Sequence, residues 1–343
     1  MAAPSTPSNP YLNQGNQTIT LGWDLNPIAT SYTINRSSDG VTYTVLATPT
    51  TNSYVDSTVT LGTMYYYTIQ TTNGSGTSLP TAPLQMVAAP NGEMSLYELR
   101  LRSQQRADRV NSQFVTTSEW NYFIQNAMYE LYDLLIDVYE DYFEAPEIVF
   151  YTSGNQYQYP LPDGKLTFIN SANNTSIVAP PFYKLSGLDL GINNANNAYV
   201  TINKYNLIDR NKYVYPNTAS TIYGVFNLQY RLLGNNIRFI PTPSNAQPIR
   251  ILYIPRLPQL LQDTDLTNIG FCGWLQYVIC RAAKYALAKE ESDTTEIDNE
   301  LIFLKGRIEE SAMNRDAGQA DTISDTRGFP WGSGPFNGLK GGW

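Results

Sequence analysis

Histidine is absent from this chain of 343 residues. Histidine is the commonest general base and the commonest metal ligand, so its absence excludes Ser-His-Asp catalysis and argues against a transition-metal site. Glu290, Glu291 and Asp293 do form an acidic cluster, but they lie at an expected helix–helix junction where Asp293 is best explained as a helix cap. The sequence therefore predicts no catalytic residues, no cofactor and no metal, and a protein that is not an enzyme.

Charged residues are also scarce, at 15% of the chain against about a quarter in ordinary soluble proteins. The net charge of -8 argues against a protein that coats nucleic acid, although it permits one that lines a path for DNA. Tyrosine, with 26 copies, is abundant instead. Tyrosine suits protein interfaces, and it is also favoured in β-sheets, so both uses are expected.

The chain has only two cysteines, Cys272 and Cys280, and both fall on one expected helix. A spacing of eight residues puts them about 12 Å apart along the helix axis, which excludes a disulfide between them. No apolar run approaches the length that spans a membrane, and Met1–Pro10 has neither a basic start nor an apolar core. We therefore expect no secretory signal, no membrane partner and no dependence on oxidation.

Residues 1–90 are rich in Thr, Ser, Asn and Pro and contain a single basic residue, Arg36. Short stretches with period-two alternation are separated by turn signals such as Asp39-Gly40, which is typical of a β-sandwich. The residues expected to point inward are Ile19, Leu21, Trp23, Tyr32, Ile34, Val41, Tyr43 and Val45.

Three features of this region resemble fibronectin type III domains. The stretch Leu61–Ile69, with Tyr65 four residues after Leu61, is similar to the tyrosine corner of that family. Trp23 stands where the family keeps its core tryptophan, and Asn73–Ser78 resembles the next turn. The resemblance implies an Ig-like, fibronectin type III β-sandwich, but it does not imply a binding partner.

Helical periodicity appears in two separate blocks, residues 95–146 and 263–315. In the first block, Ser95 with Glu98 and Thr116 with Glu119 predict capping boxes at the starts of two helices, the first reaching about residue 110.

The second block predicts a helix from about residue 271 to 288 and another that Asp293 caps together with Glu296. The two blocks are expected to form one module of about four helices. Residues 147–262 between them predict a β-rich insert, with a hairpin around Gly234 and a loop-dominated stretch from Asn170 to Asn197. Residues 316–343 predict an extended, Gly-rich tail, which completes a multidomain α+β protein.

Residues 95–327 resemble the head-to-tail connector proteins of tailed bacteriophages, also called adaptor or head-completion proteins. The matching segments keep their order and spacing over more than two hundred residues. They are Arg106–Asp108, Phe114–Thr116, Glu130–Leu135, Tyr230–Leu232, Ile237–Pro243, Leu252–Pro255, Trp274–Val278, Lys289–Asp293, Asn314–Gly318 and Ser324-Asp325.

The resemblance implies a structural virion protein that forms a ring, typically a dodecamer, below the portal. Its partners would be copies of itself, the portal protein, and tail or nozzle proteins, with genomic DNA passing through the lumen without specific binding. It would reside in the neck of the virion, and in the host bacterial cytoplasm during assembly.

The N-terminal domain departs from the minimal family pattern. It could contact capsid or tail fibres, decorate the connector, or bind host surface sugars. Virion decoration or host adhesion through residues 1–90 is therefore the alternative function. A third possible function is that of a cell-wall hydrolase. The sequence disfavours it, because no pair of acid and base residues suited to catalysis can be recognised.

Arg102, Arg106 and Arg109 share one face of the first expected helix. This face could dock an acidic partner or contact phosphate. It could also be a solvated face with local ion pairs to Glu98 and Asp108.

The C-terminal end carries the other candidate interface residues. Arg315 could reach carboxylates on a neighbouring subunit or cap the preceding helix. The tail carries aromatic residues on a Gly-rich segment, which fits either docking into a partner's groove or an end without a role. These residues are Phe329, Trp331, Phe336 and Trp343.

Overall fold

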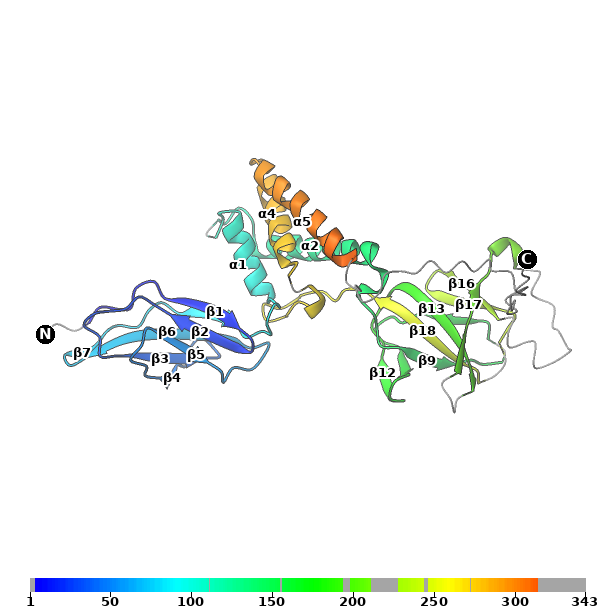
Figure 1. Cartoon of the computed structure of the whole chain (residues 1–343), viewed down its shortest axis with the longest axis horizontal. Coiled ribbons are helices and arrows are strands. Elements are labelled where there is room, and N and C mark those ends of the chain that lie inside the picture. Colours follow the sequence, from blue (N-terminus) through cyan, green and yellow to red (C-terminus); the bar gives the residue numbers. More distant parts are fainter. Residues whose placement is uncertain are drawn as a thin grey trace, which may run out of the picture.

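The computed structural model describes residues 4–110, 112–154, 156–193, 198–210, 228–243, 246–271 and 273–313. These residues form a multidomain α+β protein with three units in a row (Figure 1). A β-sandwich lies at the N-terminal end, four long helices lie in the centre, and a second β-unit lies at the far end. Two of the helices precede the second β-unit in the sequence and two follow it.

The N-terminal unit is a sandwich of two antiparallel sheets, ordered β1-β2-β5 and β4-β3-β6-β7, with β8 paired to β6. Trp23, Tyr32 and Tyr67 are buried between the sheets, with Trp23 packed edge-on against Tyr32. The strands are β1 Tyr11–Gly15, β2 Thr18–Gly22, β3 Ser31–Ser37, β4 Thr44–Ala47, β5 Ser53–Asp56, β6 Met64–Asn73, β7 Gly76–Thr77 and β8 Leu84–Val87.

The tyrosine corner is present, because the backbone N–H of Thr60 donates to the Tyr65 hydroxyl at 3.0 Å. The expected inward alternation of Val41 and Val45 is wrong, since these side chains are 82% and 64% exposed. The physical reason is the turn before them. The Asp39 carboxylate accepts the N–H groups of residues 41 and 42, so the strand begins only at Thr44.

A charged cluster closes one end of this sandwich. Arg36 donates to the buried carboxylate of Asp56 at 2.8 Å, and the Tyr67 hydroxyl donates to the same carboxylate at 2.9 Å. Burial alone would raise the pKa of Asp56, but hydrogen bonds from Thr58, Arg36 and Tyr67 outweigh it and hold the pKa below its usual value. A buried carboxylate of this kind stabilises the sandwich only while it is ionised.

We expect the sandwich to lose stability in acid. Because the folded-state pKa of Asp56 is depressed, its contribution is complete above the unfolded value of roughly 3.9 and is lost as the pH falls through the folded value. Asp56→Asn should lower the free energy of unfolding of this unit by about 3 kcal/mol at neutral pH, because it leaves Arg36 unpaired. Calorimetry between pH 3 and 7 measures both effects. An unchanged transition in the variant would contradict the role of the cluster.

The central unit consists of α1 Leu96–Arg106, α2 Thr117–Val138, α4 Leu275–Lys289 and α5 Thr295–Met313. Thr116 and Glu119 form the reciprocal capping box that the sequence predicts. At the start of α1 only half of the predicted box is found: the Ser95 hydroxyl accepts the N–H of Glu98, but the Glu98 carboxylate accepts from Arg102. The predicted extension of α1 to residue 110 is wrong, because the helix ends at Arg106 and Asp108 takes a left-handed backbone conformation.

The predicted capping box of Asp293 with Glu296 is also wrong. The Asp293 carboxylate accepts the N–H of Thr295, the first residue of α5, at 2.9 Å. Asp293 therefore holds the turn before the helix.

A shared apolar core joins the two sequence halves of the helical unit. Leu131 of α2, Val278 of α4 and Ile308 of α5 belong to one buried cluster. At the edge of this cluster, Glu130 of α2 accepts hydrogen bonds from three side chains of α4. Arg281 donates to it at 2.7 and 3.0 Å, and the hydroxyls of Tyr285 and Tyr277 also donate to it. Glu130 thus fixes the register of α2 against α4.

Glu130→Ala should lower the free energy of unfolding of the helical unit by about 2 kcal/mol, because Arg281 loses its carboxylate partner in a half-buried place. The matched control is Asp137→Ala, an exposed acid on the same helix. Chemical denaturation of the full chain measures the two variants side by side. Equal losses in both would show that the Glu130 contacts contribute nothing specific.

The segment that follows the β-insert wraps around the start of α1. Ser95 and Leu266 form an antiparallel bridge, and the N–H of Leu96 donates to the carbonyl of Asp265 at 3.0 Å. Arg100 of α1 makes a bidentate pair with Asp263 at 2.8 and 2.9 Å. Residues far apart in sequence are thereby locked together where the helical unit begins.

The second β-unit has a six-stranded sheet, β12-β11-β9-β18-β13-β14, and a four-stranded sheet, β10-β17-β16-β15. Its core takes Leu188 and Ile249 from the first sheet and Ile237 and Phe239 from the second. The strands are β9 Ile148–Tyr151, β10 Gln158–Pro160, β11 Thr167–Asn170, β12 Ser176–Val178, β13 Phe182–Asn193, β14 Ala198–Thr201, β15 Asn203–Lys204, β16 Gln229–Leu233, β17 Asn236–Ile240 and β18 Pro248–Pro255. Short 3-10 turns span Glu140–Tyr142, Leu207–Asp209 and Ile269–Phe271.

The expected hairpin around Gly234 is confirmed as β16 and β17, but the expected loop over 170–197 is wrong. Twelve of those residues form β13, the longest strand described in the chain. Its pairing with β18 shifts register twice, between Phe182 and Lys184 and between Leu185 and Gly187. Each irregularity interrupts the period-two alternation that would have marked a strand.

Candidate interaction surfaces

Arg102, Arg106 and Arg109, which the sequence predicts on one helix face, all make ion pairs within the chain. Arg102 donates to Glu98 one turn earlier on α1, at 2.6 and 3.0 Å. Arg106 reaches across to α5, where its guanidinium lies 2.6 Å from Glu300 and 3.3 Å from Glu296. The Glu300 hydrogen bond contributes most to raising the pKa of Arg106. Arg102 therefore makes the local pair to Glu98, and Arg106 joins two helices.

Arg109 follows the same pattern beyond the end of α1. Its side chain donates to the Glu290 carboxylate at 2.7 Å and to the backbone carbonyl of Asp108 at 2.9 Å. Glu290, part of the acidic cluster of the sequence, thus serves as the partner of an arginine. The three guanidiniums brace the helical unit internally.

Arg315, Phe329, Trp331, Phe336 and Trp343 lie outside the described residues, as does the tail 316–343. Cys272 lies outside them as well. Cys280 is buried in the core beneath α5, and burial raises the pKa of its thiol to about 11. Cys280 is a packing residue of this core.

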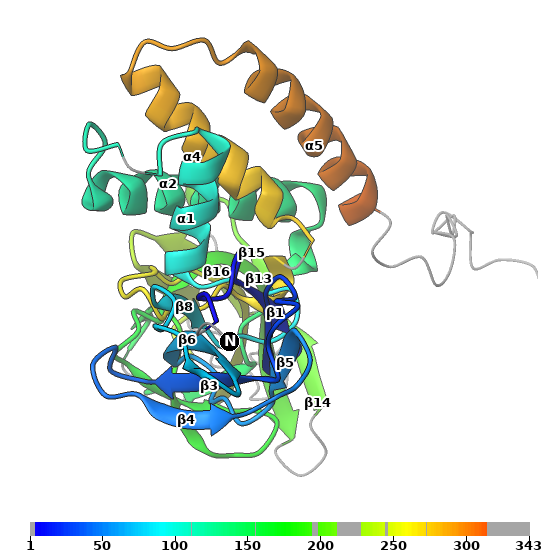
Figure 2. The same ribbon diagram turned by 90° about the vertical axis from the view of Figure 1, so that its left-hand side faces the viewer.

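Three large apolar side chains of α5 are exposed among the polar residues of its outward face. Ile302, Phe303 and Met313 are 72%, 69% and 68% exposed. Gly306 lies between them, and a Cβ added there would meet nothing within 4 Å. We call Ile302, Phe303, Gly306 and Met313 the α5 outer face. The helix lies at the outer edge of the helical unit (Figure 2).

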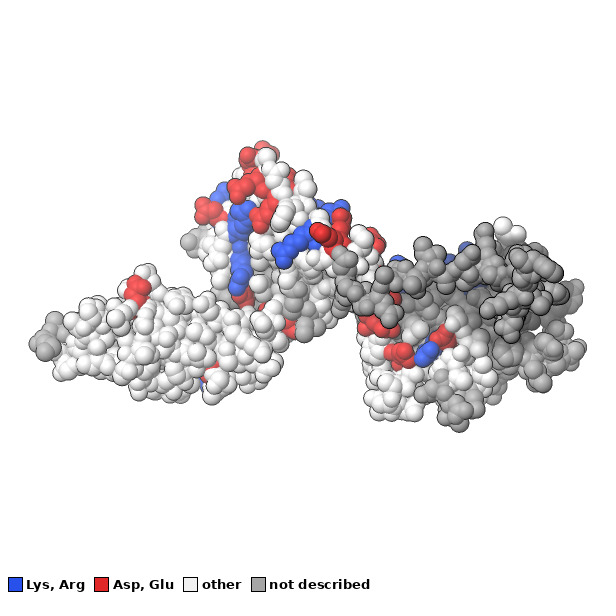
Figure 3. Space-filling view, in the orientation of Figure 1, with Lys and Arg blue, Asp and Glu red and all other residues white. Residues whose placement is uncertain are grey.

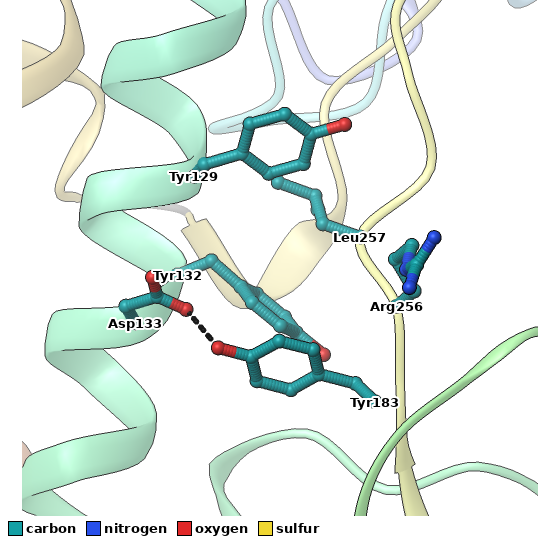
Figure 4. Close-up of a pocket in the computed structure, with 6 residues that line it drawn as sticks. All are labelled: Tyr129, Tyr132, Asp133, Tyr183, Arg256 and Leu257. Atoms are coloured by element: carbon teal, nitrogen blue, oxygen red, sulfur yellow. Dashed lines mark hydrogen bonds between the residues drawn. The ribbon is translucent and has the colours of Figure 1, made fainter. Parts of the chain in front are cut away.

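A hollow of about 280 Å³ opens where α2 meets the second β-unit (Figure 4). Tyr129 and Asp133 line it from α2, Tyr183 lines it from β13, and Arg256 lines it from the strand exit after β18. Tyr132 forms its floor and donates to the carbonyl of Pro255.

Tyr183 also lines a second hollow, of about 270 Å³, on the β-unit. The second hollow is lined by apolar and basic side chains of both sheets, among them Lys184, Leu232 and Lys204.

Two polar contacts link α2 and the turn after it to β13, beside the ring contact of Tyr132 with Tyr183. The Tyr183 hydroxyl donates to Asp133 at 2.6 Å, and Lys184 lies 3.2 Å from Glu140. The Asp133 hydrogen bond is the main cause that raises the pKa of Tyr183 to about 12. This contact could not be predicted from the sequence, because Asp133 and Tyr183 are fifty residues apart.

Elsewhere, the surface of the N-terminal unit is almost uncharged (Figure 3). Its charged residues are Asp24, Arg36, Asp39 and Asp56, and Arg36 and Asp56 are paired with each other. Among the described residues, no group of acidic or cysteine side chains is arranged to hold a metal ion. No described helix has the length and apolar character needed to cross a lipid bilayer.

Comparisons with solved structures find fibronectin type III-like domains that match part of the chain. No family model matches the sequence, and no curated protein matches it. A Fn3-like protein from Clostridium thermocellum is 32% identical, over 24% of this chain and 92% of that chain, with a TM-score of 0.23. A protein titled FN3tt is 24% identical over 26% of this chain and 98% of its own, with a TM-score of 0.24.

The N-terminal unit is a fibronectin type III-like domain. This assignment rests on its own two-sheet strand order, its buried Trp23 and the Tyr65 corner. A β-1,2-glucanase from Parabacteroides distasonis also matches, at 22% identity over 32% of this chain and 16% of that chain, with a TM-score of 0.25. None of these similarities extends to the whole chain.

The hydrogen bond between Tyr183 and Asp133 can be tested by measuring the free energy of unfolding at alkaline pH. Because the pKa of Tyr183 is raised in the folded state, its contribution is complete below the unfolded value of roughly 10 and is lost as the pH rises through about 12. Tyr183→Phe should therefore unfold more easily than the wild type at pH 8. The gap between the two proteins should shrink above pH 10. A gap that is absent at pH 8, or constant to pH 12, would contradict the Asp133 contact.

Proposed function

We propose that this chain is a structural virion protein, a connector subunit that forms a ring below the portal of a tailed bacteriophage and joins it to the tail. The sequence resemblance over residues 95–327 supports the proposal. The α5 outer face is the single structural observation that carries it, because it is a surface suited to a further chain.

The α5 outer face has the marks of a helix that packs against a partner. A glycine inside a helix lowers stability by about 1 kcal/mol relative to alanine. No described atom lies close enough to Gly306 to exclude a larger residue there. Exposed Ile302 and Phe303 beside it add an apolar surface that water does not favour. Both features are explained if another polypeptide approaches the helix closely at Gly306.

In a ring, each copy contacts the next through two different surfaces. The same contact then repeats around an axis until the ring closes. In this arrangement the helical unit forms the body of the ring, and the β-unit and tail give contacts along the axis to the portal and to tail or nozzle proteins. Genomic DNA passes through the lumen. The net charge of -8 fits a wall that does not grip DNA.

The direct test is deletion of the gene from the virus that encodes the chain, followed by electron microscopy of the particles. We expect heads filled with DNA that lack tails, and restoration of tails by the wild-type gene in trans. Complete, infectious virions without the protein would contradict the proposal.

Ile302→Asp combined with Phe303→Asp should abolish ring formation, because two charges would be buried at the subunit contact. The fold should survive, since both side chains are exposed in the single chain. The matched control is Ile28→Asp with Leu79→Asp, two exposed apolar residues of the fibronectin-like domain. Native mass spectrometry of the purified proteins measures ring size, and rings in the first variant would contradict the role of α5.

The alternative is virion decoration or host adhesion through residues 1–90. The neutral surface rich in Thr, Ser and Asn favours it, because such a surface suits hydrogen bonding to uncharged partners such as sugars. Virions that lack residues 1–90 discriminate between the two functions. Normal assembly with poor adsorption supports adhesion, whereas failed assembly gives the domain an architectural role in contact with capsid or tail fibres. We propose no catalytic function, and a turbidity assay on host cell walls tests that.

A further inference from the structure

The second β-unit is basic, whereas the rest of the chain is acidic. Residues 147–262, which contain this unit, carry nine Lys and Arg against four Asp and Glu, a net charge of +5. Because the whole chain has a net charge of -8, all other residues together carry a net charge of -13. The positive charge is therefore concentrated in one unit, at the end of the molecule away from the fibronectin-like domain (Figure 1).

Within this unit, the four-stranded sheet carries cations without any acid. Its strands β10, β15, β16 and β17 contain Lys204, Arg231 and Arg238, and no Asp or Glu. Among the described residues, the ion pairs of the second β-unit are those of Lys184 and Arg250, and they involve none of these three cations. The charge of this sheet is thus not neutralised by any described side chain.

Two of the cations stand side by side. Arg231 of β16 and Arg238 of β17 are directly opposite each other in the sheet, and they project from the face opposite to the core residues Leu232 and Ile237. Like charges directly opposite each other destabilise a sheet. Arg231 donates to the carbonyl of Tyr205 at 3.3 Å, and the Nε of Arg238 has no hydrogen-bond partner among the described residues. An anion bound at this pair would remove both disadvantages.

The side chains around the arginine pair suit a phosphate. Tyr157 lies beneath Arg238, with 5.0 Å between the guanidinium carbon and the ring centroid, and it is 47% exposed. The exposed Gln158 is directly opposite Arg238 on β10. Tyrosine hydroxyls and glutamine amides, like arginines, donate hydrogen bonds to DNA phosphates. We call Tyr157, Gln158, Arg231 and Arg238 the arginine face.

The arginine face lacks the marks of a protein-docking surface. No described strand residue of the four-stranded sheet is an exposed large apolar side chain. Protein interfaces usually have such residues at their centre, surrounded by a polar rim. A polar, cationic face with an aromatic ring is instead typical of contact with a nucleic-acid backbone.

We propose that the arginine face binds the phosphate backbone of duplex DNA without regard to base sequence. Arg231 and Arg238 contact the phosphates, and Lys204 adds positive charge on the neighbouring strand. The acidic remainder of the chain repels DNA, so the contact is confined to this sheet. The inference rests on the proposed function only for the source of the DNA, which in a connector is the genome that passes through the ring.

DNA binding by the full-length protein tests the proposal. Fluorescence anisotropy of labelled duplexes, measured at several salt concentrations, should give equal affinities for two unrelated sequences. Arg231→Gln with Arg238→Gln should weaken binding at least about tenfold. The same change should reduce the slope of log affinity against log salt by about 0.9 for each lost phosphate contact.

The matched control is Arg102→Gln with Lys165→Gln, which removes two exposed cations outside the four-stranded sheet and changes the net charge equally. This variant should bind DNA as the wild type does. Equal losses in the two double variants, or a wild type that does not bind DNA at low salt, would overturn the proposal. Polyglutamate that binds as tightly as DNA would assign the face to an acidic protein and would also overturn it.

Thermal unfolding separates binding from folding. Without DNA, Arg231→Gln with Arg238→Gln should be at least as stable as the wild type, because the like-charge pair is gone. Added DNA should raise the Tm of the wild type more than that of the variant. A variant that is less stable without DNA would show that the arginines serve the fold and would contradict the proposal.

The proposal and the connector function fail in different experiments. Loss of the DNA-binding proposal leaves the connector function standing, since ring formation does not require the arginine face. Absence of the chain from the virion neck would overturn the connector function, whereas the DNA affinity of the purified protein would be unaffected.

Discussion

The packing of α2 against α4 is the contact on which the rest of the molecule depends. It unites segments that are separated by the whole β-insert, and the buried side chains of Leu131 and Val278 lie at its centre. Glu130 sets the register of this contact by accepting hydrogen bonds from Arg281. Because α2 packs against α4, α5 is held at the outer edge of the helical unit and the β-unit is held at the end of α2. The position of the α5 outer face is a consequence of that one arrangement.

Local signals in the sequence were sufficient for much of this fold. Helix starts were predictable because Ser95 and Thr116 act on backbone N–H groups only three residues away. The β13 strand was not predictable, because its irregular pairing with β18 removes the alternation that marks a strand. The candidate surfaces were harder still. Tyr183 and Asp133 meet only after the fold has formed, although Ile302 and Phe303 could have been noticed as apolar residues outside the buried stripe of their helix.

The charged side chains differ in whether they pair within the chain. Arginines that looked like a docking face are used to brace the helices, as in the pair of Arg106 with Glu300. Lys204 and Arg256 of the second β-unit, by contrast, make no ion pair with any described residue and line its hollows. The fibronectin-like domain carries almost no charge. Its Gln14 side chain bonds to the backbone carbonyls of residues 90 and 93, in the segment that leads to α1. Such a domain can be carried on the outside of an assembly without disturbing its body.

The most direct measurement is a cryo-electron microscopy reconstruction of the neck of the mature particle at side-chain detail. We predict several copies of this chain around the DNA path, each with its α5 outer face in contact with another chain. Density for the chain elsewhere in the particle, or isolated copies at the neck that do not touch one another, would contradict it.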